Sequence, residues 1–255
     1  MFQYENFVFD YEPYPVGVCR EFIAGAFYQQ LIEQFPPIEL FGHHADGKTR
    51  KEILSELYEP DAYRAFVRRT PVYLELYRYI KSRAFIHDVL NCFERHFIQL
   101  SLFDAKITST TLPVVVPLYH HVERALRRLH LRKRGLFARF EFSALPSDGG
   151  CIRPHTDSTT KIITLVVSIL EPGEWNTAWK GGTDILRPKD IRRNYKFVNN
   201  YLDFGECETL RTIEYVPNQC IMFLKTFNSL HSVPPIQNTG GHARRRTLTI
   251  NIETA

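Results

Sequence analysis

Residues 136–170 read LFARFEFSALPSDGGCIRPHTDSTTKIITLVVSIL, and this stretch marks a change in the character of the chain. Its two ends, 136–145 and 161–170, are short and rich in β-branched and aromatic residues, a composition typical of β-strands. Residues 146–150 (PSDGG) between them have the chemistry of a turn. The stretch therefore predicts two strands whose connection carries the tripeptide His-Thr-Asp at 155–157.

The strand-like pattern continues towards the C-terminus. Three more short segments have it: 209–216 (TLRTIEYV), 220–227 (CIMFLKTF) and 245–253 (RRTLTINIE). Pro-Gly, Gly-Gly and Pro-Asn pairs separate the segments, as turns between strands would. Several short strands spaced in this way indicate a sandwich or barrel rather than βαβ units. The sequence predicts a double-sheet jelly roll.

Before residue 135 the apolar residues recur at helical spacing instead. Residues 19–37 predict a short strand or turn and then a helix that ends at Pro36-Pro37, since proline breaks helical geometry. Residues 72–98 suit one or two amphipathic helices, and 118–134 suit another, with a glycine as its stop. We expect an α+β protein with a mainly β core. Residues 1–135 would form a helical support region and 136–255 the β core, as one structural unit.

The composition of the chain narrows its class. Its 255 residues are 44% hydrophobic and carry a formal net charge of +4, too small an excess to indicate nucleic acid. The N-terminus has no apolar run typical of a secretory signal. No stretch of the sequence approaches the length of about 20 apolar residues that a membrane helix requires. The five cysteines are scattered and never spaced as CxxC, against a disulfide framework or a cysteine zinc site. A soluble cytoplasmic protein is expected.

Three side chains in the C-terminal half could share a metal ion. His155 and Asp157 are two residues apart, and in extended chain such residues project to the same side. His231 follows 76 residues after His155, as a third ligand from another strand would. Two histidines and one carboxylate leave open positions on one face of an octahedral metal, the facial triad of non-haem Fe(II) oxygenases. A lone HxD or a lone histidine is common by chance, so the hypothesis depends on their conjunction.

The last predicted strand supplies a complementary feature. Its alternation puts Arg245, Thr247, Thr249 and Asn251 on one face and apolar residues on the other. A guanidinium fork beside a hydroxyl suits the far carboxylate of a dicarboxylic cosubstrate.

With these residues in view, the segment 137–253 resembles the 2-oxoglutarate/Fe(II)-dependent oxygenase superfamily, in particular its prolyl 4-hydroxylase-like branch. The matching text is RFEFSALPSDGGCIRPHTD, KIITLVVSIL, KGGTDIL, FLKTFNSLHSVPPI and RRTLTINI. The resemblance implies a distorted double-stranded β-helix, cupin-like, supported by N-terminal helices. It also implies that His155 and Asp157 are the family's HxD and His231 its distal histidine, all three ligands of Fe(II).

The same resemblance places Arg245 with Thr247 on the arginine-x-serine/threonine pair that holds 2-oxoglutarate. Because three arginines are consecutive, Arg246 is the alternative. It implies a dioxygenase that uses O2, releases succinate and CO2, and hydroxylates a substrate C–H bond, with desaturation left open. A carboxylate at Asp157 argues against halogenation. Residues 183–206 look like an insertion that could form a lid or a substrate wall.

Other interpretations stay open. A cupin-like binding or sugar-modifying protein would share the jelly roll without iron. The basic run 124–134 could contact nucleic acid, although a solvated helix face is the simpler explanation. The pairs His43-His44, with Asp46, and His120-His121 are weak metal candidates. Arg139 and Lys161 could approach a ligand or form salt bridges. For the substrate, a small metabolite or carbohydrate is preferred over a protein, with nucleic acid and membranes not expected.

Overall fold

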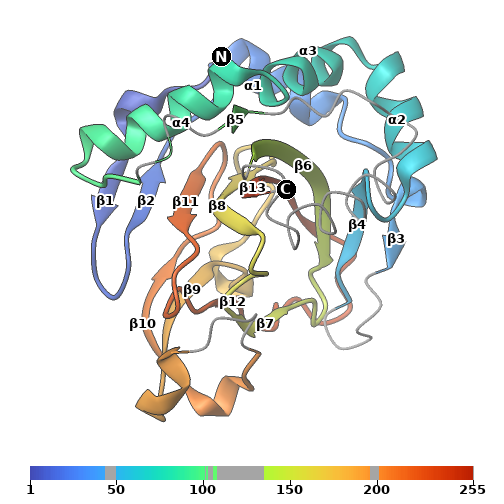
Figure 1. The fold of residues 1–255 in the computed structure, drawn as a ribbon. Helices are drawn as coiled ribbons and strands as arrows, with labels where there is room; N and C mark the ends of the chain where they lie inside the picture. The colour runs from blue at the N-terminus through green and yellow to red at the C-terminus, as the bar shows by residue number, and fades with distance from the viewer. Residues whose placement is uncertain (44–49, 101, 103–105, 108–134, 196–200, 255) are drawn as a thin grey trace.

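The computed structural model of the chain describes residues 1–254 except 44–49, 101, 103–105, 108–134 and 196–200. Within these residues, two sheets face each other beneath a layer of helices (Figure 1). The larger sheet contains β1 (Val8–Asp10), β2 (Val16–Cys19), β3 (Gly42–His43), β4 (Glu52–Ser55), β5 (Lys106–Ile107), β6 (Gly135–Pro146), β8 (Lys161–Ser168), β11 (Cys220–Leu224) and β13 (Arg244–Thr254). The smaller sheet contains β7 (Ile152–His155), β9 (Thr183–Pro188), β10 (Cys207–Ile213) and β12 (His231–Val233).

The strand order fits a jelly roll. The larger sheet runs β1-β2-β11-β8-β13-β6-β4-β3, and β5 pairs with β6; the smaller runs β10-β9-β12-β7. All these pairings are antiparallel except that of β5 with β6, which is parallel. Several neighbouring strands, such as β11 and β8 or β13 and β6, are distant in sequence, as Greek-key connections require. The expected fold class is confirmed.

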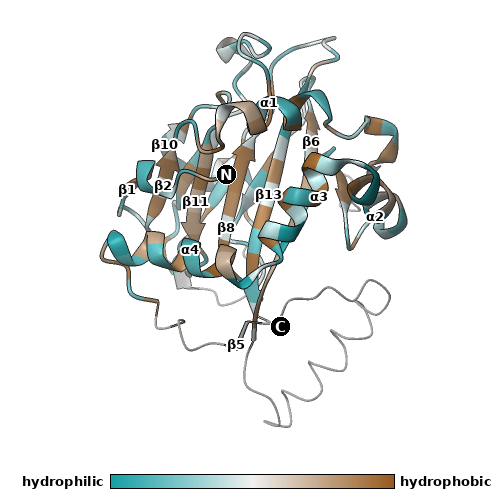
Figure 2. Ribbon diagram, turned by 90° about the horizontal axis from the view of Figure 1, so that it is seen from above, coloured by the Kyte–Doolittle hydropathy of each residue, from teal (hydrophilic) through white to brown (hydrophobic). Residues whose placement is uncertain are grey.

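Four helices cover the outer face of the larger sheet (Figure 2): α1 (Gly25–Glu33), α2 (Pro60–Arg69), α3 (Pro71–Ile80) and α4 (Arg83–Arg95). Both α2 and α3 begin with proline, which is tolerated at the first helical position because its missing N–H would have no partner there. The Ser82 hydroxyl caps α4 by accepting from the backbone N–H of Phe85. None of the described helices is long and apolar enough to cross a membrane.

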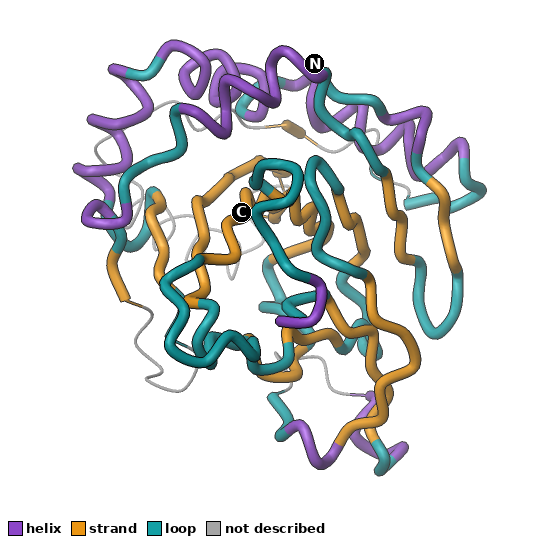
Figure 3. Tube along the Cα trace, turned by 180° about the vertical axis from the view of Figure 1, so that it is seen from behind, coloured by secondary structure: helices purple, strands orange, loops and turns teal. Residues whose placement is uncertain are grey.

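The main core lies between these helices and the sheet. Phe142 of β6 packs edge-to-face against Tyr73 of α3, with ring centroids 4.9 Å apart. Leu248 and Ile250 of β13 are buried in the same cluster, which draws side chains from both halves of the chain. Seen from behind, the long helices all gather on this one side (Figure 3). The opposite face of the larger sheet is therefore left to the polar residues of β6, β8 and β13.

The structure departs from the sequence predictions in the N-terminal half. Strands β1 to β5 come from the first 135 residues, so this region is not only helical. Each is two to four residues long, too short for a period to be detected, and their pairing with β6 and β11 is a tertiary contact. Helix α2 was also not predicted. The expected helix 118–134, the basic run 124–134, His44, Asp46, His120 and His121 lie outside the described residues.

Candidate metal and cosubstrate site

The smaller sheet brings the predicted histidines together. His155 is the last residue of β7 and His231 the first of β12, and the two are direct partners in the antiparallel register. Their ring centroids are 4.4 Å apart. With Asp157 they form a group whose potential ligand atoms all lie within 4.8 Å of one another. Residues 76 positions apart in the sequence thus meet at one point.

Asp157 reaches this point by a route that the sequence did not predict. The strand ends at His155, and Asp157 has φ 66°, in the left-handed region, so the two side chains do not converge through the alternation of an extended strand. Aspartate tolerates this conformation better than most residues because its short polar side chain can hydrogen-bond locally. The turn leaves Asp157 Oδ1 3.6 Å from His155 Nε2.

Backbone carbonyls set the orientation of both imidazoles. His155 Nδ1 donates to the Arg153 carbonyl at 2.9 Å, and His231 Nδ1 donates to the Ser229 carbonyl at 2.9 Å. These two bonds place a proton on Nδ1 of each ring, so that Nε2 is the nitrogen available to a metal ion. Such a bond to the outer nitrogen is what orients metal-binding histidines in proteins.

The carboxylate of Asp157 is buried and ionised. It accepts from Lys161 Nζ at 2.7 Å on Oδ1 and from Thr164 Oγ1 at 3.1 Å on Oδ2. Burial opposes its ionisation, but the charge of Lys161 and the nearby imidazoles outweigh burial and hold the pKa of Asp157 well below its usual range. The group is an anion at neutral pH, as a metal ligand must be.

His231 is held neutral by its surroundings. Burial, and then the neighbouring His155, lower the pKa of His231 to about 3, against the opposing effect of Asp157. A neutral imidazole needs to lose no proton before it binds a metal ion.

This shift makes the stability of the metal-free protein depend on pH. The unfolded chain protonates a histidine near its ordinary pKa of 6.5 while the folded protein keeps His231 neutral, so stability present above pH 6.5 is lost as pH falls. Between pH 7 and pH 5 we expect this residue to lower the free energy of unfolding by about 2 kcal/mol. Urea unfolding of the parent and of His231→Asn at both pH values measures it. An equal loss in both proteins would contradict the expectation.

A cavity of about 90 Å³ joins the triad to the last strand. Its far wall carries Arg245, Thr247 and Thr249 of β13, and the opposite side of that strand faces the core, as its alternation predicted. We call this space the inner cavity. It is lined by His155, Asp157, His231, Thr164, Thr183, Val166, Phe223, Arg245, Thr247 and Thr249, among others.

Arg245 is a buried cation at the end of the inner cavity. Its Nε donates to the Gly181 carbonyl at 2.6 Å, its Nη2 lies 3.4 Å from Thr183 Oγ1, and its guanidinium lies 4.8 Å from the centre of the Tyr215 ring. Burial lowers its pKa to about 10, which still leaves it charged at neutral pH. Within the described chain, no carboxylate pairs with it. A buried charge without a counter-ion is costly, so the site is suited to an anionic ligand.

Arg246 lies on the other side of the strand. It makes an ion pair with Glu174, N–O 2.6 Å, and its guanidinium lies 5.4 Å from the centre of the Phe35 ring. The inner cavity therefore receives Arg245 and not Arg246. The sequence left these two open because consecutive arginines give no unique register.

A second space, of about 240 Å³, adjoins the first on the outer side of His155. We call it the outer chamber. Its lining includes Lys51, Leu57, Tyr58, Arg139, Glu141, His155, Ser158, Lys161 and Tyr201. Lys51, Glu141, His155 and Lys161 also line the inner cavity, so the two spaces adjoin each other.

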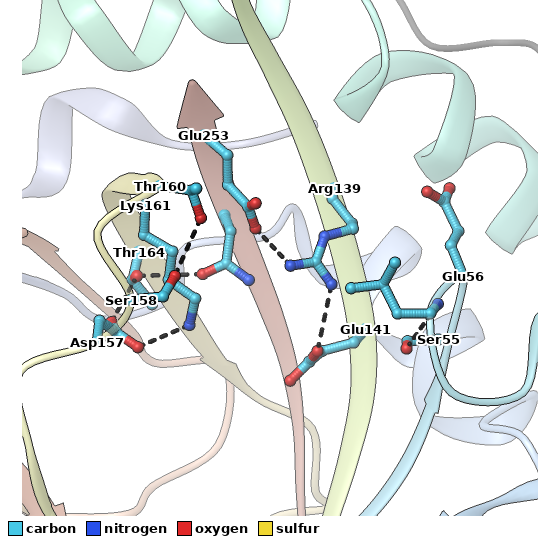
Figure 4. Close-up of polar contacts among 12 residues, drawn as sticks. Ser55, Glu56, Arg139, Glu141, Asp157, Ser158, Thr160, Lys161, Thr164 and Glu253 are labelled. Carbon is cyan, nitrogen blue, oxygen red and sulfur yellow. Dashed lines mark hydrogen bonds and ion pairs between the residues drawn. The ribbon is translucent and has the colours of Figure 1, made fainter. Parts of the chain in front are cut away.

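Charged residues on neighbouring strands meet beside the outer chamber (Figure 4). Arg139 makes an ion pair with Glu253 and lies 3.9 Å from Glu141, and Lys161 holds Asp157. The sequence left open whether Arg139 and Lys161 approach a ligand or form salt bridges. In the structure both residues line the outer chamber, and both form salt bridges. Glu141, Lys51, Tyr58 and Tyr201 were missed. The alternation of Arg139, Glu141 and Ser143 along β6 was the signal that could have found one of them.

Part of the proposed insertion lies at the site. Residues 183–206 begin with β9 and include two short turns of 3-10 helix, η4 (Ile191–Tyr195) and η5 (Phe204–Glu206). Tyr201 stacks on His155, with ring centroids 5.8 Å apart and planes 13° apart. The segment places one aromatic ring against a potential metal ligand.

Comparisons with known proteins give a likeness in structure alone. No family model and no curated sequence matches the chain. A prolyl 4-hydroxylase from Phytophthora capsici is 17% identical with a TM-score of 0.51 over 94% of this chain and 59% of that one. A Pseudomonas putida prolyl-4-hydroxylase is 13% identical, TM-score 0.45, over 94% and 92%.

A prolyl hydroxylase from Trichoplax adhaerens, in complex with a hypoxia inducible factor oxygen degradation domain peptide fragment, is 13% identical. Its TM-score is 0.47 over 93% of this chain and 83% of that one. The likeness to the Phytophthora protein carries the conclusion: the chain has the double-stranded β-helix fold of the prolyl 4-hydroxylase-like oxygenases, as its sequence resemblance implied.

Proposed function

We propose that the protein is an Fe(II)- and 2-oxoglutarate-dependent dioxygenase that hydroxylates a substrate C–H bond, with release of succinate and CO2. One observation carries the proposal. A His-Asp-His group, in which Asp157 and His231 are buried and His155 is half-buried, lines one cavity of about 90 Å³ together with a buried arginine that has no counter-ion among the described residues. A metal ion held by the triad, together with a dicarboxylic cosubstrate bound to that ion, would compensate both the triad and the arginine.

The donor set of His155, Asp157 and His231 fits Fe(II). Two neutral imidazoles and one carboxylate are the facial triad of non-haem iron oxygenases, which keeps the remaining coordination positions for other ligands. When bound, iron and 2-oxoglutarate supply the activation of O2 and the oxidising power. The protein supplies the orientation: two carbonyls hold the imidazoles, and Lys161 and Thr164 hold Asp157.

Arg245 is the residue that we assign to the far carboxylate of 2-oxoglutarate, with Thr247 and Thr249 beside it. Its buried charge is already held in place by the Gly181 carbonyl, so little side-chain freedom is lost when the anion binds. Arginine can present a planar fork to a carboxylate. Burial also excludes water, which strengthens each electrostatic contact inside the cavity.

The cupin-like alternative does not account for this arrangement of charged groups. A binding or sugar-modifying protein without iron would not need the Asp157 charge or the buried Arg245 cation, both of which cost desolvation. For the setting of the enzyme, the described cysteines are buried and none of them forms a disulfide, which supports a cytoplasmic, reducing environment.

The proposal is tested by anaerobic reconstitution of the purified protein with Fe(II) and 2-oxoglutarate. We expect one Fe(II) and one 2-oxoglutarate per chain, 2-oxoglutarate binding that requires the metal, and succinate formation once O2 is admitted. Isothermal titration measures the binding and chromatography measures succinate. A sample loaded with Mg(II) is the control for the redox step. If the protein binds neither Fe(II) nor 2-oxoglutarate, the proposed function is wrong.

A further inference from the structure

The outer chamber is rich in charge for a space so close to the core. The side chains of Lys51 and Lys161 are 18% and 20% exposed, and that of Glu141 is 10% exposed. Lys51 Nζ lies 2.9 Å from Glu141 Oε1, and Lys161 Nζ lies 2.7 Å from Asp157 Oδ1. Buried charges are retained in proteins when a partner or a ligand compensates them.

The charges around the two spaces do not cancel. In the described part of the chain, four cations face three anions there. The cations are Lys51, Arg139, Lys161 and Arg245, and the anions are Glu141, Asp157 and Glu253. The nearby Lys81–Glu56 ion pair adds no net charge. A divalent metal ion and the 2-oxoglutarate dianion cancel each other, so one positive charge stays in excess after both have bound.

Binding of the metal ion and 2-oxoglutarate would shift the excess positive charge from Arg245 to the lysines of the outer chamber. In the empty protein the unpaired cation is Arg245, which 2-oxoglutarate would neutralise. A metal ion bound to Asp157 would be partly neutralised by that carboxylate, so the carboxylate would compensate less of the charge on Lys161. Arg139 keeps Glu253, so Lys161 and Lys51 are left to share Glu141.

The dimensions and rim of the outer chamber limit what it can hold. Its volume of about 240 Å³ is below the roughly 300 Å³ at which pockets for drug-sized ligands begin. Tyr58 and Tyr201 stand at its rim, 45% and 52% exposed, with Leu57 beside them at 46%. These side chains could cover the carbon skeleton of a small molecule while the lysines bind a charged group.

We propose that the substrate is a small organic acid, whose carboxylate binds Lys161 and Lys51 in the outer chamber while its carbon chain lies against Tyr58 and Tyr201. This inference rests on the proposed function and narrows its substrate class. A monoanion makes the loaded site neutral, which a neutral sugar does not. The lysines that bind the carboxylate line both spaces, so the carbons next to it lie towards the metal site.

The probe is a panel of short-chain carboxylic, hydroxy and amino acids, each matched with its primary amide. Mn(II) replaces iron, since imidazole and carboxylate ligands also accept Mn(II). Paramagnetic relaxation of ligand protons by NMR then reports binding close to the metal, and protein loaded with Mg(II) gives the diamagnetic baseline. We expect acids in the panel to be relaxed and to bind at least about tenfold more tightly than their amides, because one charge-assisted hydrogen bond is lost.

Two variants with opposite expected effects make the test specific. Lys51→Met removes one cation that touches no proposed metal ligand, and we expect affinity for the acid to fall about tenfold. Glu141→Gln removes the competing anion, and we expect affinity to rise. Lys180→Met, at an exposed lysine outside both spaces, is the matched control and is expected to change nothing. Circular dichroism and Mn(II) binding are measured first for each variant.

The outcomes separate this inference from the proposed function. If amides relax as strongly as acids, if Lys51→Met binds acids unchanged, or if no small acid binds, the inference is overturned. Binding that requires the anion to be carried on a peptide also overturns it. In each case Mn(II) and 2-oxoglutarate binding by the parent protein would still support the dioxygenase. If the parent binds neither of these two, the proposed function itself fails.

Discussion

His155→Ala and Asp157→Ala are each expected to weaken Fe(II) binding by at least about 100-fold, since even outer partners of a metal ligand are worth 10- to 100-fold in affinity. We expect succinate formation to fall below detection in both variants. The physical reason is the loss of one of three donors that meet within 4.8 Å and that the backbone and Lys161 hold in place. Anaerobic titration with Fe(II) measures the affinity.

The matched control is His43→Ala. His43 is exposed at the end of β3 and belongs to one of the two other histidine pairs of the sequence, so its removal is expected to leave Fe(II) affinity unchanged. Asp157→Ala also leaves Lys161 without its partner, so Asp157→Asn, which keeps the shape of the side chain, separates metal loss from unfolding. Iron affinity equal to that of the parent in His155→Ala or Asp157→Ala would show that the metal assignment is wrong.

Arg245→Met is expected to weaken 2-oxoglutarate binding by about 100- to 4,000-fold, because breaking a buried charge pair costs about 3–5 kcal/mol. Fe(II) affinity stays near that of the parent, since Arg245 is not a metal ligand. In the absence of ligands, we expect Arg245→Met to be at least as stable as the parent. Removal of a buried cation without a counter-ion raises the free energy of unfolding or leaves it unchanged. Titration of the Mn(II)-loaded protein with 2-oxoglutarate, and urea unfolding without ligands, measure the two effects.

Arg246→Met is the matched variant next to it in the chain. Arg246 pairs with Glu174 at the surface, so its loss costs at most about 1 kcal/mol of stability and leaves 2-oxoglutarate affinity intact. Arg245→Lys keeps the charge but not the fork, and partial recovery of affinity is expected. Equal loss of 2-oxoglutarate binding in the Met variants of 245 and 246 would contradict the assignment of the carboxylate to one of them.

The sequence identified the chemistry of the site more completely than its geometry. His155, Asp157 and His231 were recognisable as donors because three ligand types stood in strand-like contexts. How they converge was not readable: Asp157 meets His155 through a left-handed turn, and His231 meets it across two short strands. Arg245 and Arg246 differ only in the face of β13 they occupy, and that face is fixed once Leu248 and Ile250 are buried.

The sequence by itself determined the longer strands β6, β8 and β13 and the helices α1, α3 and α4, and it supplied the proposed set of metal donors, because each has a signal in local composition or in a repeating pattern. Tertiary structure alone decided the strands of the N-terminal half, the burial of Arg245, and the meeting of Lys51 with Glu141 and of Arg139 with Glu253. Those features have no local signal. They follow from strand pairing between distant segments, which removes charges from water and makes their compensation necessary.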